Sequence, residues 1–237
     1  MAEAPLHAAG RRRAAVLISG RGSNLQALIG HCENPAASAE IALVISDEPT
    51  AGGLAHAHAA GVPGAIVDHR QHPDRDRFEH AINEALQTHS IAVVCLAGFM
   101  RILSPAFVDR WRDRLLNIHP SLLPAFRGLD THRRVLEAGV RFHGCTVHFV
   151  RAEVDAGPII VQGMVPVGAD DTPERLAARV LRLEHRCYPL ALELVAAGRV
   201  KVERECVTID GAITPDMMLI NPLGDGRISR GRGRMEP

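Results

Sequence analysis

The sequence has no excess charge of either sign, and this absence excludes several broad classes of partner. Lysine plus arginine and aspartate plus glutamate each total 27 in 237 residues, so the formal net charge is zero. A protein that binds nucleic acid or an anionic membrane through its overall charge carries an excess of basic residues. We therefore expect no nucleic acid and no membrane as partner, and any anion that binds must meet a local site.

Paired cysteines and long apolar runs are also lacking. The five cysteines are widely spaced and form no C-x-x-C, which argues against a disulfide framework and against a zinc knuckle. The first residues, MAEAPLHAAGRRR, lack the apolar core of a secretion signal. No later run approaches the roughly 20 apolar residues that are needed to cross a bilayer. These features predict a cytoplasmic protein.

Histidine is plentiful, with 13 residues, but its spacing does not indicate a metal site. His69 and His72 form an H-x-x-H pair, and His56 and His58 form an H-x-H pair. Neither pair comes with a convincing third ligand or a cysteine pair, so solvated surface histidines are the simpler interpretation. We predict no metal.

Short runs rich in Val, Ile and Leu alternate with longer helical stretches, which is the pattern of βα units on a parallel sheet. The expected strands are residues 14–19, 41–46, 64–67, 91–96, 115–118, 144–150 and 158–166. The expected helices are residues 24–31, 53–60, 74–88, 131–138 and 172–197. Thr172 suits the N-cap of the last helix and Gly198 its end. Residues 200–213 resemble a terminal hairpin with Asp210-Gly211 at its turn.

These elements predict an α/β fold with a Rossmann-like, mostly parallel sheet, helices on both faces, and a long C-terminal helix followed by a hairpin. We expect one domain over residues 14–213, because the chain is long enough for one substantial core. Residues 1–13 would be a disordered N-terminal extension. Residues 221–237 are rich in glycine and arginine and would be a disordered tail.

A glycine-rich turn follows the first expected strand. In V-L-I-S-G-R-G-S-N-L-Q, two glycines allow a sharp turn that leaves the backbone N–H groups of Gly22, Ser23 and Asn24 at a helix N-terminus. The helix dipole favours an anion there, so these residues are candidates for binding a phosphate. The segment is not a G-x-G-x-x-G motif, because Leu25 stands where the third glycine belongs. An ordinary turn capped by Ser23 or Asn24 is the alternative.

An amide and an imidazole lie at the end of the strand expected at 115–118. Asn117 and His119 are two residues apart, so their side chains project to the same side at the carboxyl end of a buried strand. Open α/β sheets bind ligands at that edge. Both groups can hydrogen-bond one oxygen, as a developing tetrahedral oxyanion requires. The alternative is that both side chains only cap backbone groups.

Asp155 precedes a glycine-proline turn in V-D-A-G-P. Aspartate at a turn usually serves the turn alone. A carboxylate near His119 would favour the protonated imidazole, which can act as an acid or as a partner of an oxyanion. Asn117, His119 and Asp155 are therefore the candidate catalytic residues.

Six blocks, in this order along the chain, resemble the phosphoribosylglycinamide formyltransferase family. They are I-S-G-R-G-S-N-L-Q-A-L, L-A-G-F-M-R-I-L-S-P, L-L-N-I-H-P-S-L-L-P, H-G-C-T-V-H-F-V, V-D-A-G-P-I-I and L-E-H-R-C-Y-P-L, and they span about residues 14–201. The resemblance implies formyl transfer from 10-formyltetrahydrofolate to the amine of phosphoribosylglycinamide, in purine biosynthesis. The folate would be a consumed co-substrate, with no permanently bound cofactor. We expect a monomer or a weak homodimer.

The resemblance also implies roles for residues that match its blocks. Gly22, Ser23 and Asn24 would hold the substrate phosphate, and Glu184 would help to hold the same substrate. Asn117, His119 and Asp155 would be catalytic. The residues expected at the folate are Arg75, Met100, Arg101, Ile102, Leu103 and Asn117.

Three alternatives stay open. Methionyl-tRNA formyltransferases present a similar Asn-x-His block, but we would expect a further C-terminal domain with a basic surface. A formyltetrahydrofolate hydrolase would normally have an additional N-terminal regulatory domain. A non-catalytic folate-binding or nucleotide-binding module is the third, and the intact Asn117, His119 and Asp155 argue against it.

Overall fold

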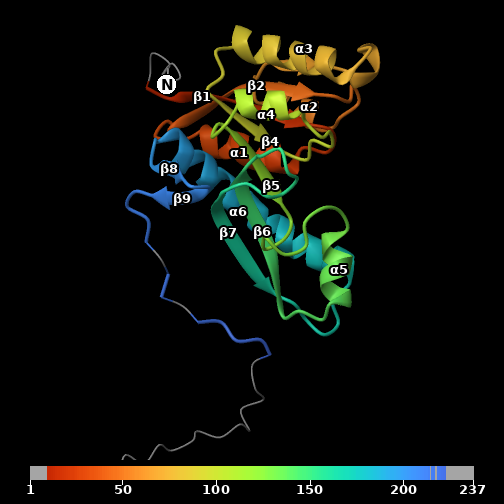
Figure 1. Ribbon diagram of the computed structural model, residues 1–237, viewed down its shortest axis with the longest axis vertical. Helices are drawn as coiled ribbons and strands as arrows, with labels where there is room; N and C mark the ends of the chain where they lie inside the picture. The colour runs from red at the N-terminus through yellow and green to blue at the C-terminus, as the bar shows by residue number, and fades with distance from the viewer. Residues whose placement is uncertain (1–9, 214, 217, 223–237) are drawn as a thin grey trace, which may run out of the picture.

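The protein is described by a computed structural model, which covers residues 10–213, 215–216 and 218–222. One seven-stranded sheet forms its centre, with the strand order β3-β2-β1-β4-β5-β6-β7 (Figure 1). Its strands are β1 (Arg12–Ile18), β2 (Ala39–Ser46), β3 (Gly64–Ile66), β4 (Val93–Leu96), β5 (Leu115–His119), β6 (Phe142–Phe149) and β7 (Ile159–Pro166). The first five in spatial order are parallel, and β6 runs antiparallel to both of its neighbours.

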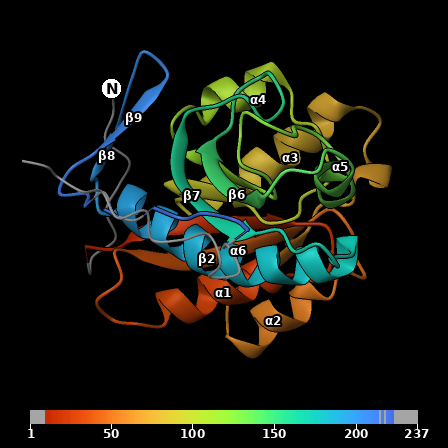
Figure 2. The ribbon, with the colours of Figure 1, turned by 90° about the horizontal axis from the view of Figure 1, so that it is seen from below.

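Helices cover both faces of the sheet (Figure 2). On one face lie α1 (Ser23–Cys32), α2 (Gly53–Ala59) and the long α6 (Pro173–Ala196), and on the other lie α3 (Arg75–Thr88) and α4 (Pro105–Arg110). A short α5 (Thr131–Glu137) contacts α6. None of the helices in the described residues is long and apolar enough to span a membrane.

The alternation of side chains along each strand creates two separate cores. In β1, Val16 and Ile18 pack with α1 and α6, whereas Ala15 and Leu17 pack with α3 and α4. Both sets are completely buried, because the strand is covered on both faces. The continuously apolar runs in the sequence have this physical origin, and the predicted Rossmann-like α/β fold is confirmed.

The C-terminal hairpin is confirmed, but its predicted turn is wrong. The strands β8 (Val200–Glu203) and β9 (Cys206–Ile209) are joined at Arg204 and Glu205, and Asp210-Gly211 follows the second strand. Both turn residues have positive φ, 51° and 58°, as a tight hairpin turn requires. Glu205 also pairs with Arg112 and with Arg151, which offsets the strain of the left-handed backbone at this position.

Two short helices and the start of the first strand were not predicted. α4 and the 3-10 turn η1 (His69–Gln71) are too short to show helical periodicity in the sequence. β1 begins at Arg12, so the predicted boundary at residue 14 and the disordered extension over 1–13 are wrong at Arg12 and Arg13. These arginines are ordered by their contacts, since Arg12 N–H donates to Ser38 and Arg13 pairs with Glu40.

Most of both predicted terminal extensions lies outside the described residues. This applies to residues 1–9 of the N-terminal extension and to residues 223–237 of the Gly/Arg-rich tail. Asn221, at the start of the predicted tail, is described, and its side chain donates to the carbonyl groups of Arg141 and Val167 at 2.6 and 2.9 Å.

Candidate active site

A polar patch lies on the sheet where the layer of α3 and α4 stops. In β5, Leu116 and Ile118 point into the core under α6, so Asn117 and His119 point to the opposite face. On that face Leu115 packs in the core with α3 and α4. The loops 120–130 and 150–158 approach His119 there, and they bring the Phe126 carbonyl and the Asp155 carboxylate to it.

His119 has a hydrogen-bond acceptor at each ring nitrogen. Its Nδ1 lies 3.3 Å from Asp155 Oδ2, and its Nε2 lies 3.0 Å from the carbonyl oxygen of Phe126. A carboxylate and a carbonyl both accept, so both contacts are satisfied only when both nitrogens carry a proton. The His119 residue is 6% exposed, which strengthens its charge interaction with Asp155. The arrangement therefore offers an acceptor to each ring N–H and fixes the orientation of the imidazole.

Asp155 is fixed by its own backbone and by the opposite loop. It has a left-handed φ of 52°, and its Oδ2 also accepts the N–H of Gly128 at 2.9 Å. Gly157 allows the loop to return close to β6, because a Cβ there would lie 1.7 Å from the Phe149 carbonyl oxygen. The glycine of V-D-A-G-P is thus needed for a close approach that brings Asp155 back to His119.

Asn117 contacts a histidine that was not predicted as a site residue. Its Nδ2 lies 3.3 Å from Nε2 of His148, which stands opposite it on β6. His148 Nδ1 lies 2.9 Å from the Phe149 carbonyl, so Nδ1 carries the proton and Nε2 accepts from the amide. Burial lowers the pKa of His148, which keeps it neutral. An isolated histidine within the apolar run T-V-H-F was the available signal.

Two more histidines lie near this group without adding charge. His132 Nδ1 and His143 Nε2 are 3.1 Å apart. Burial, helped by the charges of His132 and His119, lowers the pKa of His143 to about 4, and burial also lowers the pKa of His132. Both are neutral at pH 7, so they do not compete with His119 for the charge of Asp155.

The glycine turn after β1 forms the predicted start of a helix. Gly22 is the N-cap of α1 with a left-handed φ of 77°, and no side chain caps this helix. A Cβ on Gly22 would lie 2.5 Å from the Cα of Gly53, so the turn also requires glycine for packing. The alternative of a turn capped by Ser23 or Asn24 is wrong, and the helix N-terminus keeps donors for an anion.

Asn24 is instead bonded to the other residue expected at the substrate. Its Nδ2 donates to Glu184 Oε2 at 2.7 Å, from α1 to α6. Burial raises the pKa of Glu184, although the hydrogen bond from Asn24 opposes this shift. Asn24 and Glu184, which are 160 positions apart in sequence, therefore form one polar group beside the glycine turn.

The strand pairing relates the position of the glycine turn to that of Asn117 and His119. Leu17 of β1 and Asn117 of β5 are both paired with Leu96 of β4. Two strand spacings separate them, or about 10 Å. The glycine turn begins just beyond Leu17, and His119 lies just beyond Asn117, so both groups lie at the same edge of the sheet. An extended small molecule can reach from one to the other.

The residues expected at the folate lie in two places. Arg75 is exposed at the first position of α3. Met100 and Ile102 are each 70% exposed, whereas Leu103 is buried in the core, so only its backbone can face a ligand. Arg101 points away from them and pairs with Asp47, at 2.7 Å, and with Glu48, at 3.5 Å.

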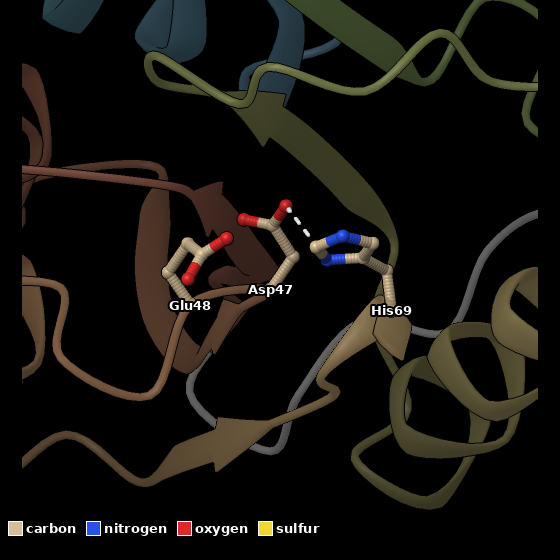
Figure 3. A group of neighbouring side chains, drawn as sticks. All are labelled: Asp47, Glu48 and His69. Carbon is tan, nitrogen blue, oxygen red and sulfur yellow. Dashed lines mark ion pairs between the residues drawn. The ribbon is translucent and has the colours of Figure 1, made fainter. Parts of the chain in front are cut away.

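Asp47, Glu48 and His69 form a group whose side-chain atoms are close enough to share a metal ion (Figure 3). This group is not one of the histidine pairs considered in the sequence. The neighbours of His69 in it are the carboxylates of Asp47 and Glu48, which follow β2, and His72 is not part of it. Arg101 and Arg70 already pair with these two carboxylates. Their positive charges oppose a second cation, so the geometry carries no metal assignment.

Comparison with known proteins points to one family. A family model described as formyl transferase matches residues 12–192. Phosphoribosylglycinamide formyltransferase of Escherichia coli (strain K12) is 44% identical over 200 residues, which cover 84% of this chain and 94% of that protein. The crystal structure of glycinamide ribonucleotide transformylase 1 from Symbiobacterium toebii is 48% identical, with a TM-score of 0.82, over 84% of this chain and 94% of that one.

A larger protein contains a similar segment. The trifunctional purine biosynthetic protein adenosine-3 of Gallus gallus is 53% identical over 190 residues. The match covers 80% of this chain but only 19% of that protein. The chain thus spans about a fifth of the length of this trifunctional relative.

Proposed function

Because the chain belongs to the formyl transferase family, we propose that it transfers the formyl group of 10-formyltetrahydrofolate to the glycine amine of phosphoribosylglycinamide, a step of purine biosynthesis. The observation that carries this proposal is the arrangement of His119, with acceptors at both ring nitrogens and Asn117 two residues away on the same face. It supplies an imidazole N–H and an amide N–H as donors where formyl transfer needs them.

In the proposed reaction the neutral amine attacks the formyl carbon. A C–N bond forms, and the formyl oxygen becomes an oxyanion on a tetrahedral carbon. Asn117 and protonated His119 stabilise this charge, and one such donor typically contributes about 3 kcal/mol. The bond to the folate nitrogen then breaks as the proton leaves the amine and reaches that nitrogen, with Asp155 ordering the water that carries it. No covalent intermediate with the enzyme is required.

The Phe126 carbonyl accepts the His119 N–H that the oxyanion needs. The proposed reaction therefore requires the loop at Phe126 to move, so that this N–H turns from the carbonyl to the substrate. Asp155 holds the other nitrogen of the ring throughout, which keeps the imidazole oriented.

The substrate's two ends match the two groups at the sheet edge. The uncapped N-terminus of α1, at Gly22, Ser23 and Asn24, suits the phosphate, and Glu184 suits a ribose hydroxyl. The folate would lie along residues 100–103, with Arg75 near its acidic outer end. The spacing of about 10 Å between β1 and β5 at this edge of the sheet suits a phosphoribosyl group that carries a short amide arm.

The test is the absorbance assay with 10-formyl-5,8-dideazafolate, run with and without phosphoribosylglycinamide. Turnover that needs the amine supports the transferase. Turnover without the amine would identify a hydrolase, and an absence of turnover would favour a folate-binding module.

A further inference from the structure

Residues 97–104 connect β4 to α4 without regular secondary structure. A backbone without a ladder of its own must find hydrogen-bond partners elsewhere. The N–H of Met100 donates to the hydroxyl oxygen of Ser19, at 2.9 Å, and the N–H of Ser104 donates to Glu79 Oε1, at 2.6 Å. The side chains of Ser19, just after β1, and of Glu79, on α3, therefore hold the two ends of residues 100–104, the proposed folate segment.

Side chains along this segment alternate between solvent and interior. Met100 and Ile102 are each 70% exposed, whereas Leu103 is buried and Arg101 is half-buried. This is the alternation of an extended backbone, which presents every second residue on one side. Two large apolar side chains are thus displayed together, and the inward residues between and beside them anchor the segment.

Asp47 holds the inward residue Arg101. Its side chain is 1% exposed, and Oδ2 accepts from Arg101 Nε at 2.7 Å. Figure 3 shows Asp47 between Glu48 and His69, and its Oδ1 has no hydrogen-bond partner among the described residues. A buried carboxylate with one unpaired oxygen is a costly way to stabilise a fold, so stability alone does not account for it.

Glu79 holds the other end of the segment. It is buried on α3, one turn after Arg75, and it accepts both the N–H and the hydroxyl of Ser104. The same hydroxyl caps α4 by accepting the N–H of Phe107. Glu79 therefore fixes the point at which the extended segment becomes a helix.

The geometry points to Asp47 and Glu79 as a pair of positioning residues that hold residues 100–104 in the shape that receives the folate. Neither touches the reacting atoms, and each acts through the segment: Asp47 through Arg101, and Glu79 through Ser104. This inference rests on the proposed function, because the folate is the ligand that the segment would receive. It predicts a defect confined to the folate, since the glycine turn and Glu184 bind the other substrate through different elements.

The test compares Asp47→Asn and Glu79→Ala with two matched controls. Glu40→Gln removes a carboxylate from β2, the strand that ends just before Asp47, and this carboxylate pairs with Arg13 at 3.0 Å. Glu84→Ala removes an exposed carboxylate from the same helix as Glu79. Glu79→Gln keeps an acceptor for the Ser104 N–H and serves as a partial rescue, and it replaces Glu79→Ala if that variant does not fold.

Two readouts are needed. The first is hydrogen–deuterium exchange of residues 97–104 in the ligand-free protein, which should quicken in Asp47→Asn and Glu79→Ala and stay unchanged in both controls. The second is steady-state kinetics. KM for 10-formyl-5,8-dideazafolate should rise about tenfold, with smaller changes in Glu79→Gln, while KM for the amine substrate and kcat change by less than about twofold.

The outcomes separate the inference from the proposed function. Faster exchange with unchanged folate KM, or equal rises in both KM values, would overturn the positioning of the folate segment. Variants that behave like Glu40→Gln and Glu84→Ala would overturn it as well. A wild-type protein that neither turns over nor binds the folate analogue in calorimetry would overturn the proposed function, and the inference with it.

Discussion

The side-chain amide of Asn117 donates to Nε2 of His148 at 3.3 Å, so a buried, neutral histidine on β6 orients the amide on β5. An amide has two N–H bonds, and His148 occupies one of them. The other is left for a substrate oxygen. The donor that stabilises the oxyanion in the proposed reaction is thus aimed by a residue that has no chemical step of its own.

We expect His148→Phe to lower kcat by about a hundredfold, because loss of one oriented oxyanion donor typically has an effect of this size. KM for both substrates should change little, since His148 belongs neither to the residues expected at the phosphate nor to the folate segment. His148→Gln should recover part of the loss, because its amide oxygen can accept from Asn117. Steady-state kinetics of both variants, with thermal midpoints, make the comparison, and equal kcat losses in the two variants would contradict an orienting role.

Glu184→Gln should weaken substrate binding and stabilise the protein. Burial raises the pKa of Glu184, so the folded state favours the protonated carboxyl and loses stability as the pH rises through that raised pKa. Replacement by a neutral amide removes this loss, and we expect the thermal midpoint at pH 8 to rise by about 3 °C. KM for phosphoribosylglycinamide should rise about tenfold while KM for the folate stays constant. A lower midpoint, or a folate effect of the same size, would count against the assignment.

Stability should fall in mildly acidic solution because of His143. Its pKa is lowered from the ordinary 6.5 to about 4, chiefly by burial. Below pH 6.5 the unfolded chain therefore binds a proton that the folded protein does not bind. The stability contributed by neutral His143 is present above pH 6.5 and is lost as the pH falls toward 4. Thermal melts from pH 7.5 to 4.5 should show a shallower decline in His143→Gln than in the wild type. Parallel curves would contradict this.

The apolar pattern allowed the fold to be predicted because most strands of the central sheet, namely β1, β2, β4, β5 and β6, are buried on both faces. Val16 and Leu17 enter different cores, and both are apolar, so the run is continuous and easily recognised. The hairpin turn was misplaced because Asp210-Gly211 has the usual turn composition, whereas Arg204 and Glu205 adopt positive φ with the help of distant ion pairs. Local sequence contains no signal for such partners.

For the candidate site, the sequence indicated the residues but not their mutual contacts. Spacing placed Asn117 and His119 on one face, and it could not reveal that the Phe126 carbonyl meets His119 Nε2 or that Asn24 bonds Glu184. These contacts join segments that are distant in sequence or have irregular backbone. His148 was missed for a related reason, since a lone histidine in an apolar strand resembles an ordinary core residue until its partner on the neighbouring strand is known.

The pairing of His119 with Asp155 gives the most demanding prediction. If Asp155 orients the imidazole, Asp155→Asn removes the carboxylate that lies 3.3 Å from Nδ1 and leaves that ring nitrogen without its charged partner. The N–H that should meet the oxyanion is then poorly placed, so kcat should fall by about a thousandfold or more while both KM values change little.

Asp155 has a second contact, because Oδ2 also accepts the N–H of Gly128. An effect through the turn alone would lower the thermal midpoint of Asp155→Asn and leave kcat nearly intact in the folded protein. His119→Asn and the double variant distinguish the two cases. Residues that act as one unit give losses that do not multiply, so the double variant should be no worse than about tenfold below either single variant. Multiplicative losses, or a destabilised but active Asp155→Asn protein, would show that the carboxylate serves the loop and not the imidazolium.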